Sequence, residues 1–427
     1  MNNTRAFRTL QEFVKEIYSC VHCGYCLDSC PTRDANYFDV YGSRGKMLIF
    51  KALLENMLRV DEDFADRIFN CALCNWCAYK CPEELPTTEI FAAARYEAAR
   101  RGLTPDTVKK SVKYVIERDN PFGAPVSERT AWSKGLNLKK RGESVLFASC
   151  MNTLMGYVEL IHKMGASFDS IVKMFDKFEK IKLEGIFRRA ASRLFDPNKR
   201  YHETLRKSVE ILNMLGIEPA YWGEEEPCCG KPLHTYGYLD KFEEHARNVA
   251  ELFRNNGVKR LIILNPICTY TFRVLYPKFL GNFDIEVKHI SEILAENLDK
   301  WADKAVLKRP IKITYHDPCY MARYMDIIEP PRTVMKNIKG VELVEPARYG
   351  KNTYCTGDGG IEVTHPESAA KIALKRTRML LETGAEKIVT TCPACIAMIN
   401  LGLRLTGSQN RVETLDLIDL VYEALKK

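Results

Sequence analysis

The stretch Cys71-Ala-Leu-Cys74-Asn-Trp-Cys77-Ala-Tyr-Lys-Cys81-Pro82 separates its first three cysteines by two residues each, and a fourth follows after three residues, directly before a proline. The same spacing occurs in Cys20-Val-His-Cys23-Gly-Tyr-Cys26-Leu-Asp-Ser-Cys30-Pro31. Two structural zinc ribbons would explain pairs of cysteines two residues apart, but they would leave the third and fourth cysteine of each run without a role. Because eight cysteines and two prolines repeat in register, the two runs are one paired feature.

This spacing is the one with which bacterial ferredoxins hold [4Fe–4S] clusters. Three closely spaced thiolates bind three corners of one cube, and the cysteine before the proline reaches the other cube. Soft sulfur ligands suit iron, and the grouping of the 16 cysteines argues against a disulfide framework. The two runs therefore predict a pair of cubane clusters in one domain.

Bulk properties narrow the class of protein. A chain of 427 residues is long enough for roughly two or three domains. The formal net charge of +8 is compatible with an acidic partner or an anionic lipid surface, but it falls short of a nucleic-acid binder's basic stripe. The first residues lack the apolar core of a signal peptide, and no apolar run approaches a membrane span. We expect a cytoplasmic protein, free or peripheral on the inner face of the membrane.

The region around the two runs has helical patterning. Apolar residues between the runs favour helix over the tight hairpins of a small ferredoxin, and a further helix is predicted over residues 88–101, ended by Gly102. We therefore expect residues 1–105 to form an all-α two-cluster ferredoxin domain. Residues 106–143 contain the breakers Pro121, Pro125, Gly135 and Gly142 and are expected as a linker.

The chain from Ser144 onward contains an internal repeat. Short β-branched runs end on cysteines and precede helical patterns, which predicts βα units and parallel sheet. The landmarks of the first copy are residues 145–150, 227–230, 261–268 and 285–294, and those of the second are 313–319, 354–357, 388–395 and 412–421. We expect two homologous α/β domains, 144–305 and 306–427, related by a pseudo-twofold axis.

The first copy carries an insertion over residues 157–200. Its apolar residues recur three and four apart, which predicts a helical hairpin with arginines beside the apolar face. One interpretation packs this hairpin on its own domain. The other makes residues 157–196 an exposed element that docks a membrane surface, a membrane anchor subunit or another partner.

Both runs and several later motifs resemble the family that contains the D-type subunit of heterodisulfide reductase and the iron–sulfur subunits of glycolate, lactate and anaerobic glycerol-3-phosphate dehydrogenases. The matching motifs are Ser43-Arg-Gly-Lys46, Pro227-Cys-Cys-Gly230, His316-Asp-Pro-Cys319, Gly340-Val-Glu-Leu343 and Thr391-Cys-Pro-Ala-Cys395. The resemblance implies two [4Fe–4S] cubanes that feed two CCG domains. It also implies crossed ligand sets, one of Cys20, Cys23, Cys26 and Cys81 and the other of Cys71, Cys74, Cys77 and Cys30.

In the reductase branch of this family a CCG motif holds a non-cubane [4Fe–4S] cluster on five cysteines, where disulfides are reduced. Here Asn265 and Tyr354 stand at two of the ten cysteine positions, so each copy has four. The expected metal ligands are Cys150, Cys228, Cys229 and Cys268 in the first copy and Cys319, Cys355, Cys392 and Cys395 in the second. Four thiolates suit a four-ligand iron–sulfur cluster or zinc.

The first copy keeps the adjacent pair Cys228-Cys229, so we expect the redox-active cluster there, with these two cysteines in catalytic roles. The alternative makes the second copy the active half and gives zinc to the first. His316 beside Cys319 is a candidate for proton transfer during thiol chemistry, and a structural hydrogen bond is the favoured alternative. His22, inside the first run, could tune the potential of its cube.

Three functions follow from these residues. The first is an oxidoreductase electron-transfer subunit, loaded by a flavoprotein or other redox subunit, because the sequence has no flavin or nicotinamide site of its own. The second is a disulfide reductase whose own CCG cluster does the chemistry. The third is an anchoring or assembly module with zinc in its CCG sites, and the complete cysteine runs argue against it.

Overall fold

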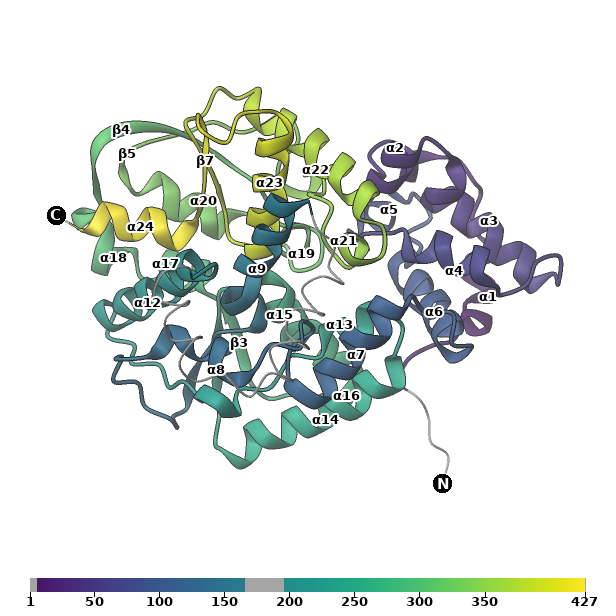
Figure 1. Cartoon of the computed structure of the whole chain (residues 1–427), viewed down its shortest axis with the longest axis horizontal. Helices are drawn as coiled ribbons and strands as arrows, with labels where there is room; N and C mark the ends of the chain where they lie inside the picture. Colours follow the sequence, from purple (N-terminus) through teal and green to yellow (C-terminus); the bar gives the residue numbers. More distant parts are fainter. Residues whose placement is uncertain (1–5, 166–195, 427) are drawn as a thin grey trace.

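The computed structural model describes residues 6–165 and 196–426. The N-terminal domain lies on the right in Figure 1, and the rest of the chain forms the larger body on the left. As expected, the described part of this domain is helical. Its helices are η1 (Leu10–Phe13), α1 (Val14–Tyr18), η2 (Tyr25–Leu27), α2 (Pro31–Asn36), η3 (Asp39–Tyr41), α3 (Ser43–Leu54), α4 (Glu62–Phe69), α5 (Trp76–Lys80) and α6 (Thr87–Arg100).

Local signals in the sequence explain where these helices begin and how they pack. The Asp61 carboxylate accepts a hydrogen bond from the Phe64 amide at 2.9 Å and caps α4. Pro31 occupies the first turn of α2, where its missing N–H costs nothing. The buried rings of Phe50, Phe64 and Phe91 join α3, α4 and α6, with centroids 6.2 and 5.7 Å from Phe50. The cysteine runs are thereby held on a rigid helical frame.

Residues 106–143, which we expected as a linker, are folded against the rest of the chain. Helix α7 (Asp106–Arg118) buries Val108, Val112 and Val115 in the core that the N-terminal domain shares with the next half. A turn follows, in which the Asn120 amide bonds the backbone of Ala124 on both its donor and acceptor sides. The prolines and glycines thus mark turns between packed helices, with α8 (Val126–Arg129) and η4 (Ala131–Ser133) after the first turn.

Two parallel sheets form the larger body. The first half contains β1 (Ser144–Phe147), β2 (Arg260–Ile263) and β3 (Glu286–His289) in that order. The second contains β4 (Val306–Tyr315), β5 (Lys339–Leu343), β6 (Lys387–Thr390) and β7 (Glu413–Asp416), in the order β5-β4-β6-β7. Strands β4, β6 and β7 follow the pairing order of β1, β2 and β3. The expected α/β architecture is confirmed for both halves, and β5 is an addition in the second half.

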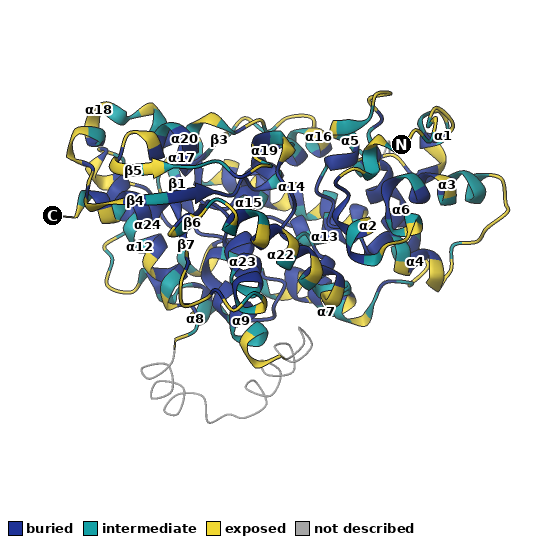
Figure 2. Cartoon of the chain, turned by 90° about the horizontal axis from the view of Figure 1, so that it is seen from above, coloured by how far each residue is buried: buried dark blue, intermediate teal, exposed yellow. Residues whose placement is uncertain are grey.

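Helices cover both sheets and join the halves into one body. In the first half they are α9 (Cys150–Met164), α12 (Lys199–Met214), η5 (Gly223–Glu225), α13 (Lys231–Thr235), α14 (Leu239–Asn255), α15 (Pro266–Tyr270), η6 (Thr271–Leu275), α16 (Tyr276–Leu280), α17 (Ile290–Glu296), α18 (Leu298–Trp301) and η7 (Ala302–Lys304). In the second half they are α19 (Cys319–Ala322), α20 (Glu329–Lys336), η8 (Gly350–Asn352), α21 (Ile361–Thr364), α22 (Pro366–Leu381), α23 (Pro393–Leu405) and α24 (Leu417–Leu425). Leu146 and Ile262 share one apolar cluster with Ile313 and Val389, so the two sheets have a common core, dark blue in Figure 2.

The predicted helical hairpin lies largely outside the described residues. Helix α9 ends at Met164, followed by Gly165 with φ of +63°, and α12 begins at Lys199. In the part of the chain that the structure describes, no helix combines the length and the apolar character needed to cross a bilayer.

Candidate iron–sulfur sites

The two cysteine runs fold into equivalent loops. In each run the residue before the second cysteine has positive φ, +54° at His22 and +46° at Leu73. The residue after that cysteine does as well, +89° at Gly24 and +62° at Asn75. Side-chain-bearing residues adopt this conformation only under constraint, so the shared pattern shows that both runs wind their thiols in the same way.

A cavity of about 420 Å³ at the surface of the N-terminal domain gathers cysteines from both runs. It is lined by Cys20, Cys23, Cys26, Cys77 and Cys81. Burial raises the pKa of the Cys20 thiol, and the thiolates of Cys81 and Cys23 raise it further because they lie near enough to repel a second negative charge. Cys81 therefore lies beside the cysteines of the first run.

A second cavity of about 340 Å³ lies deeper in the same domain. Its cysteines are Cys26, Cys30, Cys71, Cys74 and Cys77. Burial raises the pKa of the Cys30 thiol, and Cys71 is one of its charged neighbours. Cys30 from the first run thus lies with the second run, which is the mirror image of the arrangement in the first cavity.

The surroundings of the second cavity fit an anionic iron–sulfur cluster. Cys77 lines both cavities, and the Thr87 hydroxyl of the first cavity's lining donates to its sulfur at 2.9 Å. The Lys46 side chain is buried, and its ammonium donates to the carbonyl oxygen of Asn70 at 3.1 Å. Burial lowers its pKa, and the nearby thiolates of Cys71 and Cys30 raise it. Hydrogen bonds and positive charge near the sulfurs are the means by which a protein holds such a cluster and tunes its potential.

The first CCG half brings its four cysteines into one group. The Cys268 thiol donates to the Cys229 sulfur at 3.3 Å. Hydrogen bonds with Cys150 and Cys229 raise the pKa of Cys228, whereas the bonds that Cys229 accepts from Cys228 and Cys268 lower its own. The cysteines come from the start of α9, the turn before α13 and helix α15. The fold thus brings Cys150 to Cys228 and Cys229 to Cys268, pairs that lie far apart in the sequence.

Asn265 stands where the family has a further cysteine, and it acts as a helix cap. Its side-chain oxygen accepts the Ile267 amide at 2.8 Å and begins α15. The amide nitrogen Nδ2 is buried without a hydrogen-bond partner in the described part of the chain. At the matching position of the second half, the Cys392 sulfur accepts the Cys395 amide at 3.4 Å. Asn265 thus keeps the capping function and offers a donor where a thiolate would otherwise bind metal.

The second CCG half lies directly against the inner cavity of the N-terminal domain. Hydrogen bonds with Cys319 and Cys74 perturb the pKa of Cys355, so a thiol that lines the second cavity touches one of the second half. Cys392 hydrogen-bonds Cys395 and raises its pKa. Tyr354, at the other missing cysteine position, donates its hydroxyl to Asp34 of α2 at 3.0 Å. This position therefore joins the second half to the N-terminal domain.

A cavity of about 1,050 Å³ opens at the first half's cysteines. Cys150, Cys229 and Cys268 line it together with the charged residues Lys231, Asp358 and Glu362. Burial lowers the pKa of Lys231 to about 7, and it raises the pKa values of Asp358 to about 6 and Glu362 to about 8. No local sequence signal indicates these three charges, because they come from two halves that only the fold brings together.

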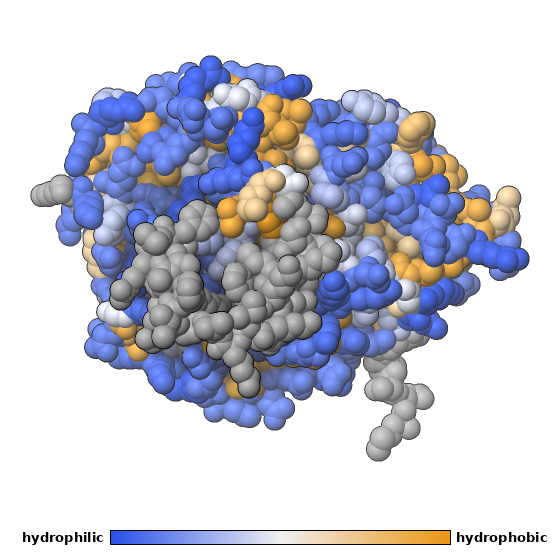
Figure 3. Space-filling model, viewed as in Figure 1, coloured by the Kyte–Doolittle hydropathy of each residue, from blue (hydrophilic) through white to orange (hydrophobic). Residues whose placement is uncertain are grey.

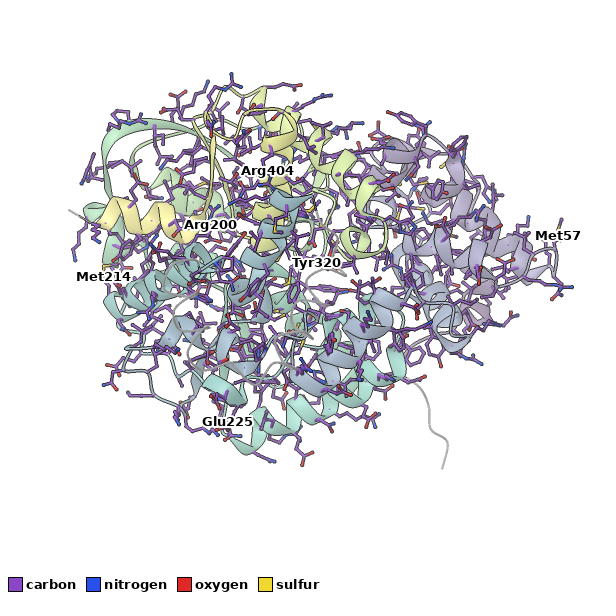
Figure 4. The ribbon with its side chains drawn as sticks, viewed as in Figure 1. Met57, Arg200, Met214, Glu225, Tyr320 and Arg404 are labelled. Carbon is purple, nitrogen blue, oxygen red and sulfur yellow. The ribbon has the colours of Figure 1, made fainter. Side chains whose placement is uncertain are left out.

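Tyrosines connect this cavity to the N-terminal domain. Tyr320, labelled near the centre of Figure 4, lines the cavity. It stacks on Tyr324 at 5.0 Å between ring centroids, and Tyr270 lies 5.2 Å from it. The Tyr324 hydroxyl donates to the Leu73 carbonyl at 2.6 Å, inside the second cysteine run. The cavity and the second cluster site are thus separated by packed aromatic rings.

His316 and Asp317 have structural partners. His316 is 1% exposed, and its Nδ1 accepts a hydrogen bond from Arg376 Nε at 3.1 Å. Burial holds its pKa well below the ordinary value. Asp317 receives two hydrogen bonds from Arg332, at 2.7 and 2.8 Å, and one from the Gly350 amide at 2.7 Å. Neither residue lines the large cavity. Of the other histidines singled out, His22 lines the surface cavity and keeps its place beside the first site.

No group of three or more His, Cys, Asp or Glu side chains in residues 6–165 and 196–426 is arranged to hold a single metal ion. The ligands of one ion must converge on one point within about 2.3 Å. Thiolates of one cluster bind different irons, so they are spread around a wider cavity. The cysteine-lined cavities of the N-terminal domain have this second arrangement.

Comparison with known proteins agrees with this geometry. The 4Fe–4S dicluster domain family matches residues 16–85, and the cysteine-rich domain family CCG matches residues 193–273 and 313–400. The chain is therefore an iron–sulfur protein of the class that joins a 4Fe–4S dicluster domain to two CCG domains.

Its homologues are oxidoreductase subunits. The D-type subunit of the dihydromethanophenazine:CoB–CoM heterodisulfide reductase of Methanosarcina barkeri is 28% identical, over 96% of this chain and 94% of the relative. The probable glycolate oxidase iron–sulfur subunit of Bacillus subtilis is 24% identical over the same shares of the two chains. The EtfAB:quinone oxidoreductase of Syntrophomonas wolfei is 25% identical, and 96% of this chain covers 58% of that relative.

Proposed function

We propose that this chain is the iron–sulfur electron-transfer subunit of a heterodisulfide-reductase-like or flavin-dehydrogenase-linked oxidoreductase complex. The observation that carries the proposal is the continuous series of cysteine sites. The surface cavity shares Cys26 and Cys77 with the inner cavity, and Cys74 of the inner cavity touches Cys355 of the second CCG half. Iron–sulfur clusters bound at such thiols supply one-electron transfer.

The proposed ligands of the two cubanes are crossed between the runs. Cys81 would complete the set of the first run at the surface, and Cys30 would complete the set of the second run inside. The lining of the two cavities supports this assignment, as do the electrostatic interactions of Cys20 with Cys81 and of Cys30 with Cys71. Each run then depends on the other, so neither cluster forms on a single run.

For the CCG halves we propose metal at both groups of four cysteines. The cavity at Cys229 and Cys268 supports the first half as the place where a substrate reaches the cysteines. If Cys228 and Cys229 do chemistry there, the chain is itself a disulfide reductase, and if the first half holds zinc, it is an anchoring element. The matched strand pairing supports a pseudo-twofold relation between the halves. Residues 144–305 and 306–427 are the proposed domain limits.

The proposed partner is a flavoprotein or another redox subunit that docks on the N-terminal domain. Cys23 is the one exposed cysteine among the described residues. Exposed apolar side chains gather on the same domain, and the view in Figure 3 shows several of them at the tip on the right. They include Tyr18, Val21, Tyr25, Tyr37, Phe38, Leu48 and Met57. An apolar surface around an exposed ligand suits the approach of an electron donor. A membrane anchor subunit on the cytoplasmic face is the alternative partner.

The test is metal analysis and EPR spectroscopy of the full chain, purified without oxygen. We expect about eight irons and as many acid-labile sulfides from the N-terminal domain, since each cubane holds four of each. Stepwise reduction should reveal two interacting signals from that domain and a further signal from a CCG half. A preparation with zinc but without acid-labile sulfide would overturn the proposal.

A further inference from the structure

Two arginines beside the second CCG half have no carboxylate among their hydrogen-bond partners. Arg376 on α22 is completely buried, with Nε donating to His316 and Nη1 to the Arg348 carbonyl at 2.9 Å. Its Nη2 is buried and has no partner among the described residues. The closest acid by its electrostatic effect is Asp317, whose two oxygens are already held by Arg332.

Arg323, just after α19, repeats this situation. Its Nε donates to the Cys74 carbonyl at 2.6 Å, and its Nη1 donates to the Thr353 carbonyl at 2.7 Å. Its Nη2 is also buried without a partner in the described part of the chain. Backbone carbonyls fix the orientation of a guanidinium, but they do not neutralise its charge.

The charge of Arg376 lies near cysteines of the second half, and that of Arg323 lies near Cys74 of the inner cavity. Burial lowers the pKa of Arg376 to about 10, and the thiolates of Cys395 and Cys355 act in the opposite direction because they are close enough to stabilise the cation. The positive charge of Arg323 lowers the pKa of Cys74. The two arginines also repel each other. Burying the Arg376 cation is unfavourable when the nearest carboxylate, Asp317, is already paired with Arg332. An anionic group at these thiols would complete the arrangement.

The first half has the same architecture but a different charge environment. Arg129 is buried beside it with Nε and Nη2 unpartnered among the described residues, and the Glu226 carboxylate lies near enough to interact with its charge. Ala250 follows Cys229 by the same number of residues as Arg376 follows Cys355, and Ala250 is buried. Leu154 likewise follows Cys150 by the same number of residues as Arg323 follows Cys319, and Leu154 is buried. The first half instead buries the carboxylate of Glu226, which accepts the Ala148 and Ser149 amides at 2.7 and 2.9 Å. The buried arginine beside the first half therefore has a carboxylate nearby, whereas neither Arg376 nor Arg323 hydrogen-bonds one.

Resting on the proposed electron-transfer function, we infer that Arg376 and Arg323 are charge-compensating residues that hold an anionic redox metal group at Cys319, Cys355, Cys392 and Cys395 and raise its reduction potential. One-electron reduction adds a negative charge to such a group, so nearby cations favour the reduced form. Contact between Cys74 and Cys355 then makes the second half the acceptor next to the inner cubane site. This assignment gives the second half an active part in electron transfer, whereas the sequence favoured the first half.

The experiment is a redox titration followed by EPR on the full chain, purified without oxygen, with dithionite as the reductant. The signal of the second half is identified by its loss in Cys355→Ala. The Arg376→Met variant is compared with the unsubstituted protein at the potential where the latter is half reduced. There we expect the ratio of reduced to oxidised form to be about tenfold lower in the variant. For one electron this corresponds to a reduction potential lower by about 59 mV. Arg376→Lys should restore most of the potential, and Arg323→Met should lower it in the same direction.

The matched control is Arg378→Met, which removes a positive charge from an exposed position of the same helix and should leave the signal unchanged. If Arg376→Met loses the metal of the second half, its return in Arg376→Lys supports the same charge role. An unshifted potential in both methionine variants with iron retained would overturn the inference, as would a second half that contains only zinc. Either result leaves the N-terminal signals in place. Their absence would instead count against the proposed function.

Discussion

The buried ion pair between Asp317 and Arg332 allows a quantitative test of the hypothesis that the His316-Asp317 motif is structural. The side chains are 1% and 4% exposed. Asp317→Asn removes the charge and one of the two bonds to Arg332, while Arg332 keeps Glu345 at 2.7 Å. Breaking a buried pair by removing one partner costs about 3–5 kcal/mol, and the surviving Glu345 contact places the expected loss near the lower limit, at about 3 kcal/mol.

This loss corresponds to a modest change in melting temperature because the chain is large. An unfolding entropy of about 2.1 cal/mol/K per residue over 427 residues gives roughly 0.9 kcal/mol/K. A loss of about 3 kcal/mol therefore lowers Tm by about 3 °C if the chain unfolds as one unit, and by more if the second half unfolds separately. Scanning calorimetry of the metal-loaded protein at a fixed scan rate measures it.

The control for Asp317→Asn is Glu386→Gln, which breaks the exposed pair with Arg309 at 2.7 Å and should leave Tm unchanged. An unchanged Tm in Asp317→Asn together with a large fall in turnover would refute the structural hypothesis. It would show instead that the carboxylate acts in the chemistry.

Three further changes test other parts of the structure. Cys81→Ala should convert the cluster of the first run to a three-iron form, and Cys30→Ala should do the same to the cluster of the second run. An EPR spectrum in which each variant instead affects the cluster of its own run would exclude crossed ligands. Cys229→Ala and Cys355→Ala should each remove metal from one CCG half only, which zinc and iron analysis measures alongside turnover. If only Cys355→Ala loses turnover, the first half is excluded as the catalytic end. Burial raises the pKa of Asp416 to about 7, well above an unfolded value of 3.8. Since the folded state then binds more protons between these values, stability falls as pH rises from about 4 to about 7, by roughly 4 kcal/mol at most. Asp416→Asn keeps the cap on Ile418 and should flatten this decline in urea titrations; an equally steep decline would assign it to other groups.

The sequence predicted the features whose signals are local. Cysteine spacing identified the two runs, and the repeat identified both sheets, since each depends on residues that are neighbours along the chain. The packing of residues 106–143 escaped prediction because Pro121 and Pro125 mark a break equally well in a linker and in a turn between packed helices.

Long-range electrostatics could not be predicted in the same way. Lys231 and Asp358 are more than a hundred residues apart, and nothing in either neighbourhood indicates that they line one cavity. Arg376 looks like any charged residue on an amphipathic helix, and only the fold shows that it is buried beside Cys355 and Cys395. That Asn265 replaces a ligand cysteine remains a prediction, and its capping role depends on backbone geometry that the sequence does not show.

The backbone at Gly359, just before α21, approaches the second cysteine run closely, and this contact has a consequence for kinetics. A Cβ on Gly359 would come within 2.3 Å of the Ala72 carbonyl oxygen, and one on Gly237 would meet the Arg95 carbonyl at 2.5 Å. Backbones in such contact leave no space for the N-terminal domain to swing as a tethered shuttle. The spacing between redox sites is therefore set once, when the chain folds. Internal electron transfer should then proceed at the same rate in buffer and in concentrated sucrose, whereas association with the redox partner should slow as the solvent viscosity rises.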